Sequence, residues 1–214
     1  MDIKGILFDC DGVILDSEYI YVNSLVDYLA TIGVKTTVEE MVCVLGKPID
    51  AIIEQVRDMF DLRDRIGHEE LLLQQRAFFQ ERFKKAHLEP MNHLVELLEL
   101  CKEKKLKTAI VSSSNSQYLD DVINRLDLHG YFDEVIGGES VVHGKPSADI
   151  YDLAQGKIGL DKEHLIIIED SCNGICAGKA SGIYTIGYKG SVIVQDTSCA
   201  DMEIRDYKEL INIL

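Results

Sequence analysis

The sequence predicts an α/β fold, a doubly wound parallel-sheet (Rossmann-like) core with an inserted α-helical cap domain. Two observations predict the core. Short apolar runs alternate with longer stretches of helical period, and uninterrupted apolar runs are typical of strands that are buried on both faces of a parallel sheet. A third observation predicts the insertion, because one long block near the N-terminus has helical period throughout and no convincing strand.

The elements of the core follow from this alternation. Apolar runs bounded by glycine, proline or polar residues predict strands at 4–9, 107–112, 134–137, 164–169 and 183–187. Helical period predicts helices at 91–104, 116–128, 147–159 and 172–182. Glycine- or aspartate-rich turns mark the ends of these helices.

The helical block runs from about residue 17 to residue 86 and interrupts the core after its first strand. We therefore expect a catalytic core formed by residues 1–16 and 87–214 and a helical cap formed by residues 17–86. Ligands of open α/β sheets bind beyond the carboxyl ends of the strands. An insertion that leaves the first strand at this edge is expected to act as a lid.

Charge and composition exclude several classes of partner. The chain has 22 basic and 37 acidic residues, a formal charge of −15 that disfavours nucleic acid and anionic membrane surfaces. No run of about 18 apolar residues predicts a membrane span, and no obligate protein partner is evident. The six cysteines form no C-x-x-C pair, which favours a reducing compartment and a cytoplasmic location.

Two aspartates, Asp9 and Asp11, end the first apolar strand in the segment ILFDCDGVILDSE, residues 6–18. Side chains two residues apart in an extended chain point to the same side, so these carboxylates repel each other unless a positive charge lies between them. Further polar residues of interest follow the other expected strands or open a helix, and they are Ser112, Ser113, Asn115, Lys145, Glu169 and Asp170.

Each of these features alone is better explained by a turn, a helix cap or a strand end than by a function. Their joint order is what favours a functional site, because carboxyl ends of parallel strands meet at one edge of the sheet. Several carboxylates and hydroxyls at such an edge suit Mg²⁺, which binds oxygen ligands and works together with substrate phosphates. The metal would supply the positive charge that the aspartates require.

Four segments that contain these residues resemble the motifs of the haloacid dehalogenase-like hydrolase superfamily, in their order and spacing. FDCDGVILDSE resembles its first motif, IVSSSN the second, GKPSADIY the third and IIIEDSCNGICAGKASG the fourth. The resemblance covers essentially the whole chain and is strongest to members with a helical cap, such as sugar phosphatases and β-phosphoglucomutase.

The resemblance implies a role for each residue of the site. Asp9 would be the nucleophile that forms an aspartyl-phosphate, and Asp11 would be the general acid and base. Mg²⁺ would be held by the Asp9 carboxylate, the Asp11 carbonyl and Asp170, with Glu169 binding directly or through water. Lys145 would offset charge between Asp9 and the phosphate.

The residues expected to contact substrate lie in two places. Ser112 and the backbone N–H of Ser113 would bind the phosphoryl oxygens, and Asn115 lies beside them. In the cap, the loop that contains Gly46 and Lys47 would contact the rest of the substrate. The expected substrate is a small phosphorylated metabolite, such as a sugar phosphate or a phosphosugar acid.

Three functions are compatible with these residues. The first is a Mg²⁺-dependent phosphatase. The second is a mutase of the β-phosphoglucomutase kind, which typically has a histidine and a cap-loop arginine where this chain has Ile20 and Ile49. The third is a receiver-like phospho-acceptor without turnover, although receivers lack both a cap and an acid two residues after the acceptor. These departures favour the phosphatase.

Overall fold

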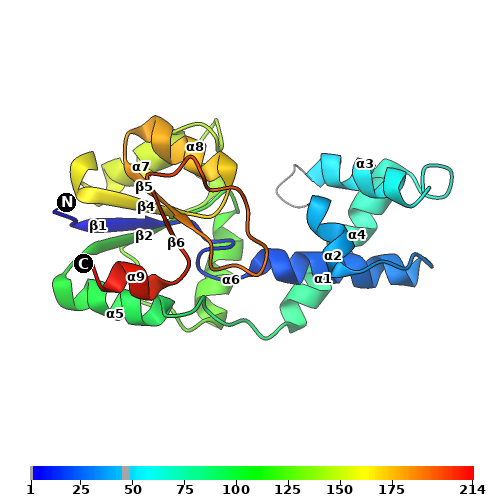
Figure 1. Ribbon diagram of the computed structural model, residues 1–214, viewed down its shortest axis with the longest axis horizontal. Coiled ribbons are helices and arrows are strands. Elements are labelled where there is room, and N and C mark those ends of the chain that lie inside the picture. The colour runs from blue at the N-terminus through cyan, green and yellow to red at the C-terminus, as the bar shows by residue number, and fades with distance from the viewer. Residues whose placement is uncertain (1, 45–48) are drawn as a thin grey trace. The chain divides into compact units, whose positions relative to one another are not determined.

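A computed structural model describes residues 2–44 and 49–214 of the chain (Figure 1). The chain divides into two compact units. We call Met1–Asp16 with Leu88–Leu214 the core unit and Ser17–His87 the helical unit. The second division falls one residue later than the boundary expected from the sequence.

The core unit is built on a single six-stranded sheet whose strand pairs are all parallel. Its strands are β1 (Gly5–Phe8), β2 (Lys107–Val111), β3 (Glu134–Ile136), β4 (Leu165–Glu169), β5 (Tyr184–Tyr188) and β6 (Met202–Ile204). They lie in the order β3-β2-β1-β4-β5-β6, so the chain winds outward from β1 in two directions. The predicted α/β fold with a parallel sheet is confirmed.

Helices cover both faces of this sheet. Figure 1 shows α7 (Asp149–Ile158) and α8 (Cys172–Ser181) on one face, with α5 (Leu94–Lys104) and α9 (Tyr207–Ile211) on the other. Helix α6 (Ser116–Arg125) follows β2. Short 3₁₀ helices at Gly138–Ser140 and Lys162–His164 complete the described elements of the core unit.

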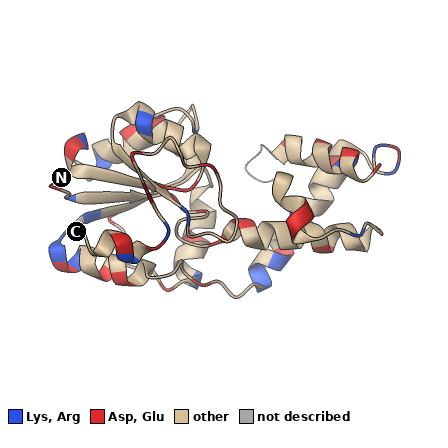
Figure 2. Ribbon diagram, viewed as in Figure 1, with Lys and Arg blue, Asp and Glu red and all other residues tan. Residues whose placement is uncertain are grey.

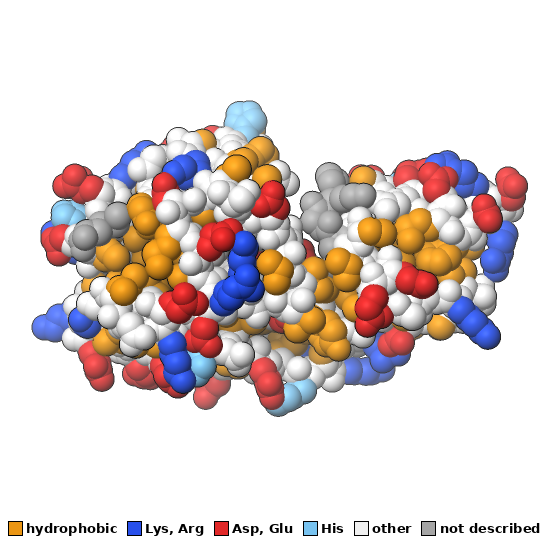
Figure 3. All heavy atoms as spheres, viewed as in Figure 1, with side chains coloured by type: hydrophobic (Ala, Val, Ile, Leu, Met, Phe, Trp, Pro, Cys, Tyr) orange, Lys and Arg blue, Asp and Glu red, His pale blue; other side chains and the backbone are white. Residues whose placement is uncertain are grey.

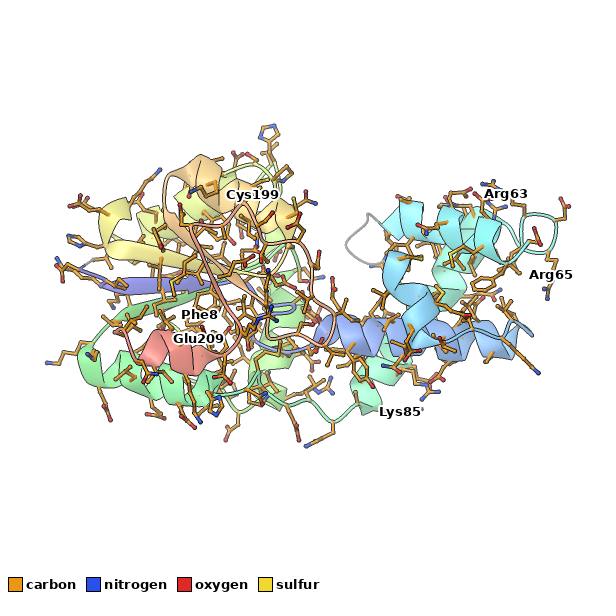
Figure 4. All side chains as sticks on the ribbon, in the orientation of Figure 1. Phe8, Arg63, Arg65, Lys85, Cys199 and Glu209 are labelled. Atoms are coloured by element: carbon orange, nitrogen blue, oxygen red, sulfur yellow. The ribbon has the colours of Figure 1, made fainter. Side chains whose placement is uncertain are left out.

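Side chains of β1 alternate between the two faces, as the pleat of a strand requires. Leu7 joins the apolar core formed with α7 and α8. Phe8, labelled in Figure 4, lies edge-on to Phe132 and Tyr207 with ring centroids 6.1 and 6.4 Å away. The strand is thus buried on both faces, which explains its uninterrupted apolar sequence.

Strand β6 and helix α9 were not predicted from the sequence. Strand β6 has only three residues, of which one is exposed and one half-buried, so no apolar run marks it. Helix α9 has five residues, and its start is fixed by a capping box in which Asp206 and Glu209 exchange hydrogen bonds with the backbone. Both elements are too short for periodicity to reveal.

The helical unit contains no strand among its described residues. Its helices are α1 (Ser17–Thr31), α2 (Val38–Met41), α3 (Ile49–Met59) and α4 (His68–Lys85), with a 3₁₀ turn at Val42–Val44. Helix α1 packs on α4 through aromatic pairs, in which Tyr21 meets Phe79 at 5.5 Å and Tyr28 meets Phe78 at 5.8 Å between centroids.

Charged residues of both signs are interspersed in each unit (Figure 2). On the face shown in Figure 3, the described lysines and arginines stand singly or in small groups among acidic side chains. Within residues 2–44 and 49–214, no helix is both long enough and apolar enough to span a membrane.

We expect the central strand β4 to dominate the stability of the core unit. Replacing Ile167, which is fully buried, with alanine should lower the free energy of unfolding by about 2–5 kcal/mol through lost burial and a residual cavity. Val142→Ala is the matched control, because Val142 is 90% exposed and its truncation should change the stability by less than about 0.5 kcal/mol. Urea unfolding followed by circular dichroism measures both, and equal effects would contradict the packing described here.

Candidate active site

The candidate site lies where β1 and β4 run side by side at the centre of the sheet. The register pairs Phe8 with Ile168, and the Asp9 N–H donates to the Ile168 carbonyl at 2.9 Å. Asp9 therefore leaves β1 level with the end of β4, where Glu169 and Asp170 follow. Strand order reverses between these two strands, and such switch points are the usual ligand sites of open α/β sheets.

Lys145 is the cation that holds this edge of the sheet together. Its Nζ lies 2.6 Å from Asp9 Oδ1 and 2.5 Å from Glu169 Oε1, and it donates to the Val111 carbonyl at 3.1 Å. The ammonium thus bridges the ends of β1, β2 and β4. Burial lowers the pKa of Lys145, but the adjacent carboxylates of Asp9 and Glu169 outweigh this and hold it well above its ordinary value.

Asp9 is buried in a site with too little positive charge. The pKa of its carboxyl is raised to about 8, chiefly by burial, with the charges of Glu169 and Asp11 adding to this effect and Lys145 opposing it. One lysine therefore does not balance the acids that converge here. A second cation at this position would reduce the repulsion among these carboxylates.

Glu169 is held by hydrogen-bond donors at both of its oxygens. Oε1 accepts from Lys145 Nζ and from the Tyr151 hydroxyl at 2.9 Å. Oε2 accepts from the N–H groups of Asp170 and Ser171 at 3.1 and 3.2 Å, and from the Ser171 hydroxyl at 3.1 Å. Five donors fix this fully buried carboxylate as an oriented anion.

The residues fit a hard divalent cation. Asp9, Glu169 and Asp170 are buried, and each offers a carboxylate oxygen within 4.8 Å of the others. Buried carboxylates in this number are stable only when they are paired or bind a metal. Because Glu169 already accepts five hydrogen bonds, it is better suited to orient the site than to bind the ion directly.

Glycine at two positions lets the backbone approach these carboxylates. Gly12 has a φ of +75°, and a Cβ there would lie 1.9 Å from Asp170 Oδ2. In α8, a Cβ on Gly174 would lie 1.8 Å from Glu169 Oε1. Only glycine satisfies both the conformation at residue 12 and the space at either position.

Ser171 connects the site to helix α8. Its hydroxyl accepts from the Gly174 N–H at 3.1 Å and so caps the N-terminus of the helix. The same hydroxyl donates to Glu169. The start of α8 and the orientation of Glu169 therefore depend on one side chain.

Asp11 is held apart from this cluster by two hydroxyl groups. The Tyr118 hydroxyl donates to Oδ1 at 2.6 Å, and the Ser114 hydroxyl donates to Oδ2 at 2.9 Å. Ser114 lies in the segment that joins β2 to α6, and Tyr118 lies in the first turn of α6. Asp9 and Asp11 are thus in different surroundings although only one residue separates them.

The other predicted site residues lie as follows. Ser112 is buried at the end of β2, and its hydroxyl accepts from the Ser114 N–H at 3.1 Å. Ser113 is exposed. Asn115 caps helix α6, because its Oδ1 accepts from the Tyr118 N–H at 2.9 Å. The predicted cap-loop residues Gly46 and Lys47 lie outside the described residues.

Sequence reasoning missed three side chains of the site, namely Tyr118, Tyr151 and Ser171. Both tyrosines occur in segments of helical period, where an aromatic residue looks like ordinary core. Ser171 directly follows Glu169 and Asp170 in the sequence. This serine, with glycine three residues later, was the available signal for a cap at the site.

Comparison with known proteins places the chain among hydrolases. A family model described as haloacid dehalogenase-like hydrolase matches residues 6–188. A phosphorylated carbohydrates phosphatase of Thermotoga maritima is 28% identical over 189 residues, which cover 86% of this chain and 83% of that protein. Hexitol phosphatase B of Escherichia coli is 27% identical over 187 residues, which cover 86% of this chain and 82% of that protein.

Solved structures share the fold. A conserved haloacid dehalogenase-like protein of unknown function from Agrobacterium tumefaciens has a TM-score of 0.85 at 24% identity, covering 99% of this chain and 97% of that chain. A hydrolase from Deinococcus radiodurans with bound phosphate and sodium has a TM-score of 0.84 at 22% identity, covering 98% of this chain and 93% of that chain. At these identities the likeness establishes the fold alone.

The setting of Asp9 predicts a pH dependence of stability in metal-free protein. Asp9 keeps its proton up to about pH 8 when folded but releases it near its ordinary pKa of 3.8 when unfolded. Between these values the folded state binds more protons, so the contribution of Asp9 to the free energy of unfolding falls as pH rises. The Asp9→Asn variant lacks this titration.

Urea unfolding of both proteins across this range measures the effect. The free energy of unfolding of the wild type, minus that of Asp9→Asn, should decrease as pH increases. A difference that is constant or increasing would show that Asp9 is charged throughout.

Proposed function

The chain belongs to the haloacid dehalogenase-like hydrolase family, and on this premise we propose that it is a Mg²⁺-dependent phosphatase. It hydrolyses a small phosphorylated metabolite through an aspartyl-phosphate on Asp9. The observation that carries the proposal is the pairing of a buried Asp9 with Lys145 at 2.6 Å, beside the further buried carboxylates of Glu169 and Asp170.

Asp9 is the group that attacks the phosphorus atom. A phosphate monoester is an anion, so a carboxylate can approach it only where cations offset both charges. Lys145 lies against Asp9 Oδ1 and favours the ionised form that attack requires. Hydrogen bonds to Asp9 and Glu169 also hold the Lys145 ammonium in place while negative charge moves to the leaving oxygen.

A bound Mg²⁺ would supply the remaining charge, since such an ion can offset the charge of phosphoryl oxygens. The Asp9 and Asp170 carboxylates and the Asp11 carbonyl would hold the ion, with Glu169 orienting the site. The observation in favour is the buried set of carboxylate oxygens within 4.8 Å of one another.

Asp11 is the proton carrier. It gives a proton to the leaving oxygen in the first step and takes one from the attacking water in the second. Two features support this role. Asp11 lies outside the ion-paired cluster, and its carboxylate contacts hydroxyl groups rather than a lysine. Ser112 and the N–H of Ser113 would bind the oxygens of the transferring phosphoryl group.

Phosphorylated carbohydrates are the substrate class that we favour. Two relatives whose alignments cover most of this chain are named phosphorylated carbohydrates phosphatase and hexitol phosphatase B. We further propose that the helical unit is a cap that selects the substrate, since its insertion point at Ser17 follows Asp11 by only six residues. Lys47 would contribute a cation to that selection.

A phosphosugar mutase is the second candidate, because its core chemistry would be the same up to the aspartyl-phosphate. A mutase must hold a second phosphate while its bisphosphate intermediate reorients. The positions where that group typically has histidine and arginine carry Ile20 and Ile49 here, and isoleucine cannot bind phosphate. We therefore rank the phosphatase first. Asp11, placed for turnover, disfavours a receiver-like phospho-acceptor.

Removal of the metal should abolish activity. In the presence of a chelator, the release of phosphate from sugar phosphates should fall to background, because Asp9, Asp170 and a phosphate cannot lie together without a cation. Excess Mg²⁺ should restore it in the wild type but not in Asp170→Asn. Asp9→Asn should be inactive with metal because an amide cannot attack. Full activity of metal-free enzyme would contradict the site assignment.

The fate of the phosphoryl group separates the phosphatase from the mutase. Given β-glucose 1-phosphate and a trace of glucose 1,6-bisphosphate, we expect more free phosphate than glucose 6-phosphate, because the cap lacks the polar pair that would retain a bisphosphate. Parallel assays of phosphate and glucose 6-phosphate measure the ratio, with Asp9→Asn as the background control. Stoichiometric formation of glucose 6-phosphate would reverse the ranking.

A further inference from the structure

The carboxylate of Asp11 is oriented by a platform outside its own loop. Tyr118 lies in the first turn of α6 and donates to Oδ1 at 2.6 Å, while Ser114 precedes the helix and donates to Oδ2 at 2.9 Å. Both donors and the carboxylate are half-buried. Because each oxygen has its own donor, the pair defines the plane of the carboxyl group as well as its position.

The platform itself is fixed by backbone contacts. The Tyr118 N–H donates to the Asn115 side chain at 2.9 Å, which sets the first turn of α6. The Ser116 N–H donates to Glu139 at 2.8 Å, and the Ser114 carbonyl accepts from the Gly138 N–H at 2.9 Å. The segment that carries both hydroxyls is therefore tied to the loop after β3, so small movements of it are restrained.

The chemistry of the donors distinguishes Asp11 from Glu169. Glu169 contacts two hydroxyls, but also an ammonium and two N–H groups, and these three can only donate and so suit a permanent anion. The two groups found at Asp11 are hydroxyls, and a hydroxyl can donate to a carboxylate or accept from a carboxylic acid. Such partners can accompany Asp11 through the gain and loss of a proton without leaving it unpaired.

We propose that Tyr118, together with Ser114, is a positioning residue that holds the carboxyl group of Asp11 in line with the leaving oxygen. The inference rests on the proposed function and deepens it. Tyr118 does not touch the phosphoryl group in this scheme. Its contribution is confined to the step in which Asp11 delivers a proton.

A hydroxyl deletion with a matched control tests the proposal. Tyr118→Phe removes the hydrogen bond to Asp11. Tyr131→Phe removes a similar phenol–carboxylate hydrogen bond, between Tyr131 and Glu99, on the surface of the same unit. The measured quantity is kcat/KM, which reports the steps up to transfer of the phosphoryl group, for glucose 6-phosphate and for p-nitrophenyl phosphate.

For Tyr118→Phe, we expect kcat/KM to fall about tenfold with glucose 6-phosphate, whose alkoxide leaving group needs a proton. With p-nitrophenyl phosphate, whose leaving group is stable as an anion, the loss should be about twofold or less. Ser114→Ala should give the same pattern, and Tyr131→Phe should match the wild type with both substrates. Equal losses with both substrates for Tyr118→Phe would overturn the inference.

A double-mutant cycle identifies the partner of Tyr118. In an Asp11→Asn background, Tyr118→Phe should cause no further loss with glucose 6-phosphate. A further tenfold loss would mean that Tyr118 acts without Asp11, which would refute the proposal. An active wild type with an unchanged Tyr118→Phe would overturn this inference alone, whereas a wild type inactive on both esters would refute the proposed function as well.

Discussion

Repulsion among buried carboxylates is the constraint on which the rest of the core unit depends. Asp9, Glu169 and Asp170 converge at the centre of the sheet, and Lys145 forms ion pairs with Asp9 and Glu169. An unpaired charge in such a place is strongly destabilising. The Lys145 bridge across three strand ends therefore stabilises the fold where these acids meet. Under the proposed function, the same ammonium would offset the charge of an anionic substrate.

Topology brings these groups together with little help from local structure. The chain winds outward from β1 in two directions, so the ends of β1 and β4 become neighbours although about 160 residues separate them in sequence. Each motif needs only to end its own strand in the right residue. The candidate site is therefore assembled from short segments, none of which indicates a site by itself.

Elements with a repeating pattern of apolar residues could be predicted from the sequence. Very short elements and single contacts between distant residues could not. Buried strands such as β1 and β4 reveal themselves as apolar runs, and the acids at their ends followed from the parallel arrangement. The three-residue β6 has no such pattern. Tyr118 reaches Asp11 across 107 positions of sequence, and no local periodicity encodes which face of α6 will meet another loop.

Ser171 illustrates how closely local folding and chemistry are joined here. Its single hydroxyl accepts a hydrogen bond from a backbone N–H in the first turn of α8, and it also donates a hydrogen bond to Glu169. A substitution at this serine would therefore perturb the helix terminus and the anion simultaneously, and no assay of the purified variant could assign the damage to one alone. At such a position the stability of the helix end and the geometry of the candidate site depend on the same oxygen atom, so a substitution cannot alter one property and spare the other.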